Sequence, residues 1–298
     1  MIPLNYDIKM NFFQDWTYYL RVQLESFGFQ SVETLSEHDI NFCYFNWMNR
    51  MVSSTPRQIH ISKEFTCPAD LKAGLEMVKN KISRGEQIWP HLSRQLKTID
   101  FNDSLLNHWG IQHLHLGTSK LPNGYMRGTK LVLFVRFDET NAYFINIYDH
   151  HSFSKIELIK ILHRNWPETI EEFRVNGEIT SKLSDSDVHS SRQKGSLTIV
   201  EVEEGISYLP IGSGYSTTKR SAGVQMTANK YCHLIKGLEA QVYLNVGTWV
   251  KKIKEEGSTI GPKLRFHLQI YENEELYAFE IISNKLFYLG NLNSLANS

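Results

Sequence analysis

The first hundred residues carry apolar positions at the spacing of an amphipathic helix. The clearest example is the segment 68–84, whose regularly spaced apolar residues are Leu71, Leu75, Val78 and Ile82. A repeat of three or four positions places these side chains on one helix face. Pro68 suits the first turn and Gly85 can end the helix. We therefore predict a mainly helical N-terminal region over residues 1–100.

From residue 101 the apolar pattern changes from helical to strand-like. Three strand-like segments follow at residues 111–116, 130–137 and 142–148, and an amphipathic segment at 155–166 ends before Pro167. Asp138–Asn141 forms a tight turn between the second and third segments, and a connection this short joins antiparallel strands. We predict a small antiparallel sheet flanked by helices over residues 101–175.

The remaining chain is predicted to hold a linker and a second domain. Residues 176–195 are polar and rich in serine, without apolar periodicity, so we expect an exposed linker or long loop there. Residues 196–298 contain a long helical stripe at 227–255 and strand-like segments at 264–271, 276–283 and 286–289. This pattern predicts a C-terminal α+β domain, and the whole chain is predicted to be α+β.

Composition excludes several classes of protein. The 32 basic and 32 acidic residues give no net charge, so no overall field attracts the protein to nucleic acid or to anionic membranes. No apolar run is long enough to span a membrane, and the N-terminus lacks the pattern of a signal peptide. The chain has three cysteines, Cys43, Cys67 and Cys232, which lie too far apart in the sequence for a cysteine zinc site. Their odd number also argues against a disulfide framework. We predict a cytoplasmic protein without a membrane partner.

Histidines mark the candidate site. Eight of the 12 histidines lie between His60 and His163. His113 and His115 are two positions apart in a predicted strand and therefore share one face, and His150 and His151 end a nearby strand. The pKa of histidine lies nearest neutrality, and its imidazole is the commonest metal ligand. This grouping predicts a functional site.

Part of the chain resembles the RelE/ParE-like toxin superfamily. The matching run has His113-Leu-His-Leu-Gly117, then Gly124 and Arg127, the apolar strand 131–137, and the segment 145–153 with Asp149-His150-His151. Members of that superfamily read as His-x-Leu before a Gly turn, an Arg-bearing strand, and a strand ending Gly/Asp-His-x-x-Tyr. The likeness covers residues 103–166. The superfamily lacks the long N- and C-terminal parts, and its basic middle strand is matched only by Lys130 and Arg136.

The resemblance implies a toxin-like or defence-type protein that cleaves RNA without a metal or cofactor. Such a reaction needs a base for the ribose 2′-hydroxyl, an acid for the leaving oxygen, and a cation for the transition state. The candidate catalytic residues are His113, His115, Arg127, His150 and His151, with Lys130 and Arg136 as candidate substrate-binding residues. The candidate partners are RNA and an inhibitory protein, and the sequence does not indicate an oligomeric state.

The residues are also compatible with two other functions. His-x-His with a third histidine from a neighbouring strand is suited to zinc, nickel or iron, with Asp149 as a ligand or an orienting partner. Alternatively, the histidines are structural and the protein is a non-catalytic interaction protein. Separately, the Gly212-Ser-Gly214 loop is a candidate phosphate cradle, and His91 and Arg94 are expected to cap or pack.

Overall fold

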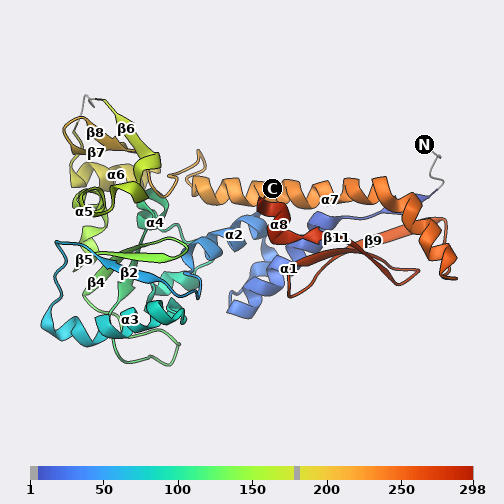
Figure 1. The fold of residues 1–298 in the computed structure, drawn as a ribbon, viewed down its shortest axis with the longest axis horizontal. Helices are drawn as coiled ribbons and strands as arrows, with labels where there is room; N and C mark the ends of the chain where they lie inside the picture. Colours follow the sequence, from blue (N-terminus) through green and yellow to red (C-terminus); the bar gives the residue numbers. More distant parts are fainter. Residues whose placement is uncertain (1–5, 178–181, 298) are drawn as a thin grey trace. The chain divides into compact units, whose positions relative to one another are not determined.

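The computed structural model describes residues 6–177 and 182–297 and has an α+β fold, as the sequence predicts. The chain forms two compact units (Figure 1). Unit 1 combines residues 1–45 with 226–298, and unit 2 is the continuous segment 46–225. The predicted boundaries near residues 100, 175 and 195 do not coincide with this division. The first and last parts of the chain pack together in unit 1, which the order of apolar residues along the chain does not reveal.

A four-stranded sheet with the order β2-β5-β4-β3 forms the centre of unit 2. Its strands are β2 (Gln58–Ile61), β3 (Ile111–His115), β4 (Leu131–Phe137) and β5 (Asn141–Asp149). The three predicted strands are present and antiparallel. The predicted helical region also supplies β2, which pairs parallel with β5, so residues 1–100 are not a separate helical domain.

Helices cover the central sheet on both faces (Figure 1). The helices of unit 2 are α3 (Lys72–Arg84), α4 (Ser104–Trp109), α5 (Glu157–Asn165) and α6 (Asp185–Lys194). One core joins Trp109 of α4, Phe134 of the sheet and Leu162 of α5. On α3, Gly74 faces the backbone of Leu116 so closely that a Cβ there would lie 1.7 Å from the carbonyl oxygen.

The predicted linker over residues 176–195 contains α6, so that prediction is wrong for the described residues. Ser184 caps α6 in a reciprocal arrangement with Asp187, and Gly195 follows its end. Val188 and Arg192, four positions apart, are buried. One buried stripe therefore anchors this polar segment beside the small sheet β6-β8-β7, whose strands are β6 (Arg174–Asn176), β7 (Val200–Glu203) and β8 (Ile206–Tyr208).

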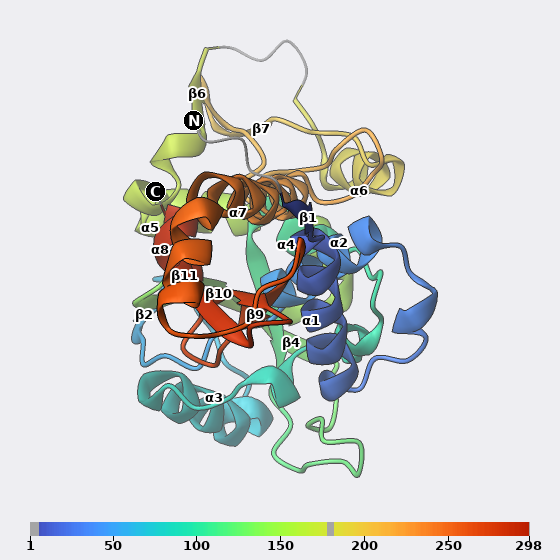
Figure 2. The same cartoon turned by 90° about the vertical axis from the view of Figure 1, so that its right-hand side faces the viewer.

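Unit 1 pairs helices with a second four-stranded sheet in the order β1-β9-β10-β11. Its elements are β1 (Asp7–Lys9), α1 (Phe12–Phe27), most of α2 (Glu37–Arg50) and of α7 (Ala222–Glu255), β9 (Lys263–Ile270), β10 (Glu275–Glu280), β11 (Lys285–Asn291) and α8 (Leu292–Asn297). Figure 2 shows α1 beside β9, where Asp15 accepts a hydrogen bond from the Leu268 amide. Trp249 of α7 stacks on Phe287, with ring centroids 4.4 Å apart.

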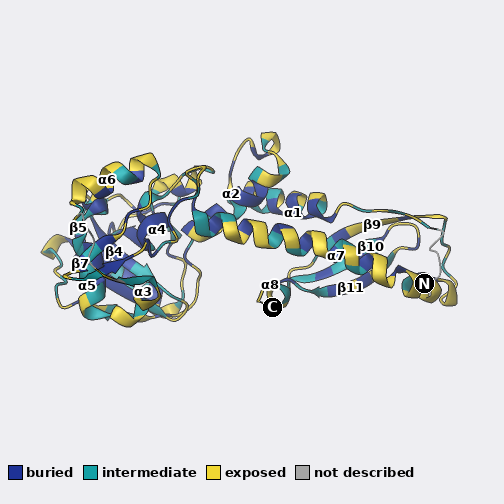
Figure 3. Ribbon diagram, turned by 90° about the horizontal axis from the view of Figure 1, so that it is seen from above, coloured by how far each residue is buried: buried dark blue, intermediate teal, exposed yellow. Residues whose placement is uncertain are grey.

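The long helix α7 has one buried face. Its buried positions recur every three or four residues, and Figure 3 shows buried and exposed faces alternating along the helix. Leu244, on the exposed side, is 83% exposed. Within the described residues, no helix combines the length and the apolar character that crossing a membrane requires.

Candidate functional site

Three histidines of unit 2 converge at one end of the central sheet. The ring centroids lie 6.1 Å apart for His113 and His115, 5.9 Å for His113 and His150, and 5.3 Å for His115 and His150. The prediction that His113 and His115 share one face of the strand is confirmed. We call His113, His115 and His150 the histidine cluster.

The strand register brings these rings together. In the antiparallel pairing, His113 lies opposite Phe134 and His115 opposite Val132. The last residue of β5, Asp149, lies opposite Leu131, so the chain leaves β5 at the end of the sheet where β3 carries His115. His150 then opens a 3₁₀ turn that spans His150–Ser154.

Burial decreases across the cluster. His113 is 7% exposed, His115 is half-buried and His150 is exposed. Burial, and then the neighbouring imidazoles, lower the pKa values of His113 and His115 from 6.5 to about 4. Both rings are therefore neutral at pH 7, and His150 is the most exposed ring of the cluster.

Backbone groups fix opposite proton positions on His115 and His150. Nδ1 of His115 lies 3.0 Å from the amide nitrogen of Thr129, which can only donate, so this ring carries its proton on Nε2. Nδ1 of His150 lies 3.2 Å from the carbonyl oxygen of Lys130, which can only accept, so Nδ1 is protonated. The neutral His115 ring thus offers a donor at Nε2, whereas the neutral His150 ring offers a lone pair there.

A shell of side chains holds the cluster in place. The ring of Phe153 lies 4.7 Å from that of His113 and 5.7 Å from that of His150. Buried His91 donates from Nδ1 to the carbonyl oxygen of His115 at 2.8 Å. Arg192 of α6 donates through Nη1 to the carbonyl oxygen of Phe153. The histidines are therefore held by contacts from the 3₁₀ turn Trp89–His91, the turn His150–Ser154 and α6.

Arg192 is part of a buried polar group that sequence reasoning missed. Its Nε donates to Nδ1 of His108 at 2.9 Å, and its guanidinium lies 4.0 Å from the centroid of the Trp109 ring. Nε2 of His108 lies 2.7 Å from the hydroxyl of Thr198. Burial, and then the Arg192 charge, lower the pKa of His108 to about 3. This group connects α4, α6 and the segment before β7.

The other predicted site residues are placed differently. His151 is exposed and is not among the rings that converge. Arg127 is exposed in the loop next to Gly128, which is close to the His115 ring, and Lys130 contributes its carbonyl to His150. Arg136 lies opposite Ile111 at the other end of β3 and lines a separate cavity.

A cation outside the predicted set also acts on the cluster. The positive charge of Arg94 is one of the influences that lower the pKa of His115. Arg94 follows His91 by three residues, a spacing for which the sequence predicts a capping or packing role. His91 does hold the backbone of His115. The spacing of His91 and Arg94 is therefore the sequence signal that points to both residues.

The cluster also has the composition of a metal centre. One ligand atom from each of its histidines lies within 4.8 Å of the others. Neutral imidazoles are the form that binds metal, and the lowered pKa values favour that form. The hydrogen bond from Thr129 opposes it, because a metal on Nε2 of His115 requires the ring proton on Nδ1, which faces an amide hydrogen.

The Gly212–Gly214 loop does not form the predicted phosphate cradle. The amides of Gly212, Ser213 and Gly214 donate to the carbonyl oxygens of His108, Pro210 and Asn107. A phosphate cradle needs these N–H groups directed at the ligand. The loop is therefore a packed turn, and Gly212 fits closely against the backbone of α4.

Comparisons with protein families, with curated proteins and with solved structures find no match to this chain. The resemblance to the RelE/ParE-like toxins therefore stays a prediction.

Proposed function

We propose that the histidine cluster cleaves RNA by acid–base catalysis without a metal. The observation that supports this proposal most strongly is the opposite protonation of two adjacent rings. Nε2 of His115 is a donor because Nδ1 accepts from Thr129, whereas Nδ1 of His150 is bound to the Lys130 carbonyl. RNA cleavage needs a fixed donor for a phosphate oxygen, here Nε2–H of His115, and a nitrogen free to carry a proton to the leaving oxygen, here Nε2 of His150.

The hydrogen bonds suggest a role for each ring. His113, neutral above about pH 4, is the proposed base for the ribose 2′-hydroxyl. Protonating Nε2 of His150 keeps its bond to Lys130, so His150 is the proposed acid. His115 stays neutral because burial, and then the neighbouring imidazoles, lower its pKa to about 4, and its Nε2–H stabilises a phosphate oxygen.

The proposed reaction balances without another reagent. The 2′-oxygen of ribose attacks phosphorus while His113 takes its proton, and the bond from phosphorus to the 5′-oxygen breaks as His150 donates a proton. The products are a 2′,3′-cyclic phosphate and a 5′-hydroxyl. Arg94, whose positive charge acts on His115, is the proposed cation for the phosphate charge. The proposed biological setting is toxin-like or defence-type, with an inhibitory protein partner.

The test is cleavage of a labelled RNA oligonucleotide in the presence of a chelator. We expect His150→Gln and His113→Gln to reduce kcat by about 100-fold or more, the scale for removing one acid or base. His189→Gln is the matched control, because His189 is an exposed histidine of α6 outside the cluster. Equal activity of the two cluster variants and wild type would refute the proposed mechanism.

A metal-dependent enzyme is the second candidate, supported by the three imidazole nitrogens within 4.8 Å. Metal analysis of the purified protein separates the two functions. One equivalent of zinc, nickel or iron, lost in His115→Gln, together with chelator-sensitive activity, would select the metal centre. A protein that binds no metal and leaves RNA intact would be a non-catalytic interaction protein.

A further inference from the structure

A cavity of about 710 Å³ lies at the other end of β3 and β4 from the histidine cluster. Its walls come from the end of α2, the segment 52–57, the first residues of β3, the hairpin after β4, and the loop at residues 211–213. Cavities of 300–1,000 Å³ are typical binding sites for small molecules. All of its lining residues belong to unit 2.

Arg136 brings an unpaired guanidinium to this cavity. It makes no hydrogen bond or ion pair with any of the described residues, although burial lowers its pKa. The carboxylate that acts most strongly on its pKa is that of Asp138, whose oxygens already accept from the Thr140 and Asn141 amides and from the Tyr143 hydroxyl. A half-buried guanidinium has five N–H donors, and leaving them without an acceptor costs free energy. An anionic ligand would provide the acceptors.

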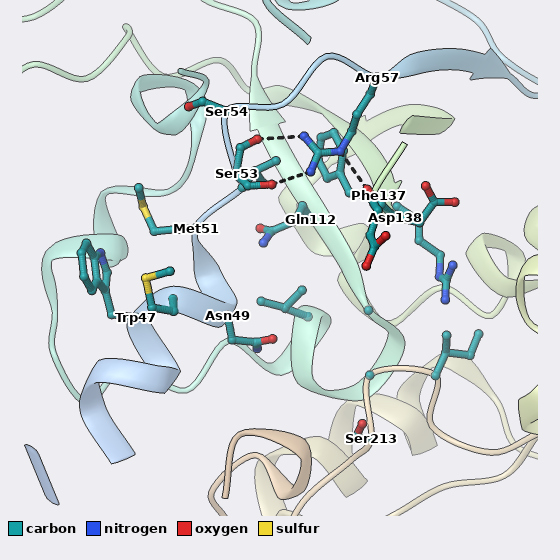
Figure 4. Close-up of a pocket in the computed structure, with 18 residues that line it drawn as sticks. Trp47, Asn49, Met51, Ser53, Ser54, Arg57, Gln112, Phe137, Asp138 and Ser213 are labelled. Carbon is teal, nitrogen blue, oxygen red and sulfur yellow. Dashed lines mark hydrogen bonds between the residues drawn. The ribbon is translucent and has the colours of Figure 1, made fainter. Parts of the chain in front are cut away.

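Arg57 adds a second positive charge but is held in place. Its guanidinium donates to the backbone oxygens of Ser53, Thr55 and Asp138 and to the Ser53 hydroxyl (Figure 4). These acceptors are uncharged, and within the part of the chain that the structure describes no carboxylate lies within 4.0 Å of the Arg57 guanidinium nitrogens. Glu139, the remaining acid of the lining, is exposed at the rim. The lining therefore holds two guanidinium groups and two carboxylates, and the Asp138 carboxylate is already bound by amides and a hydroxyl.

The opposite wall is suited to a flat apolar group. Trp47 and Met51 lie along one side of the cavity, across from Arg57 and Phe137, with the Gln112 amide between the two sides (Figure 4). An indole and a thioether pack well on the face of an aromatic ring. The Ser213 hydroxyl, which has no hydrogen-bond partner among the described residues, also reaches the lining.

We propose that this cavity binds a nucleoside monophosphate, with its phosphate on Arg136 and its base against Trp47 and Met51. A ligand of this class has both an anionic end and a flat ring, which match the two walls. An arginine fork binds phosphate oxygens in pairs. The site is separate from the histidine cluster and does not depend on RNA cleavage.

Calorimetric titration of the full chain with adenosine monophosphate tests this site. Arg136→Gln removes the charge and fork, and we expect the Kd to rise about 10- to 100-fold, the scale of charge-assisted hydrogen bonds. Arg136→Lys should give an intermediate Kd. Arg84→Gln, at an exposed arginine outside the cavity, should leave the Kd unchanged. Circular dichroism and thermal unfolding check that each variant folds.

The ligand class is tested with adenosine and inorganic phosphate alone. The proposal requires each fragment to bind at least 10-fold more weakly than the nucleotide, and a short RNA that competes for the site would identify a nucleotide of RNA as the occupant. Failure of wild type to bind adenosine monophosphate would overturn the proposal. An unchanged Kd in folded Arg136→Gln would overturn it too.

Discussion

Acidification from pH 7 to pH 5 should destabilise unit 2, because folding holds several of its histidines neutral. The pKa of His108 falls to about 3, and those of His113 and His115 fall to about 4, from 6.5 in each case. The unfolded chain therefore binds more protons than the folded one below pH 6.5, so the free energy of unfolding decreases as the pH falls. This stabilisation is complete above about pH 6.5 and is lost as the pH falls toward 4 and then 3.

The size of the effect follows from these pKa values. A histidine with a pKa of 6.5 in the unfolded chain and 3 to 4 in the folded protein destabilises it by about 2 kcal/mol between pH 7 and pH 5. The contribution of His108 is separate from that of the cluster, because its hydrogen-bond partners are Arg192 and Thr198 and not the other histidines. His113 and His115 repel each other when charged, so their contributions are not independent.

Urea unfolding at pH 7 and pH 5 measures this effect. His108→Gln keeps an acceptor for Arg192 and a donor for Thr198 but does not titrate. The change in unfolding free energy between the two pH values should therefore be about 2 kcal/mol smaller in His108→Gln than in wild type. Equal pH dependence in the two proteins would refute the reasoning, because His108 would then not be held neutral.

Three further predictions concern activity and packing. The kcat/KM for RNA cleavage should fall as the pH is lowered through about 4, the pKa of His113, because the proposed base is then protonated, and activity that does not decrease there would contradict the assigned role of His113. Gly74→Ala should cost more than about 2 kcal/mol in urea unfolding because its Cβ meets a backbone oxygen at 1.7 Å, whereas Gly237→Ala, with open space around it, should stabilise α7 by about 1 kcal/mol. Arg192→Met should lower the unfolding free energy by about 2–3 kcal/mol because two buried acceptors lose their donor, and unchanged stability would disprove that role.

The spacing of apolar and polar residues predicts single helices and strands and the face on which a side chain lies. The helix before Gly85, the strands 111–116, 130–137 and 142–148, and the shared face of His113 and His115 all follow from spacing alone. The approach of His150 also followed, because a short hairpin fixes which strand ends lie together. Pairings between distant segments, such as β2 with β5, depend on packing that no local pattern encodes.

The segment 176–195 illustrates why a polar composition can mislead. Its capping residues, Ser184 with Asp187 and then Gly195, are recognisable helix signals in the sequence. The low apolar content of the segment points to a loop despite these signals. In the structure, the buried side chains of Val188 and Arg192 are enough to anchor the helix. The hydrogen bonds that decide the ring protons of the cluster come from the backbone of Thr129 and Lys130, and backbone partners leave no trace in residue identity.

The discontinuous composition of unit 1 has a consequence during synthesis on the ribosome. Its first 45 residues leave the ribosome well before residues 226–298, and the continuous segment 46–225 is made in between. At 5–20 residues per second this interval lasts on the order of 10–40 s. The apolar face of α1, with Phe12 and Trp16, lacks its α7 partner for that time. Nascent chains should therefore recruit chaperones at their N-terminal helices while unit 2 is already folding.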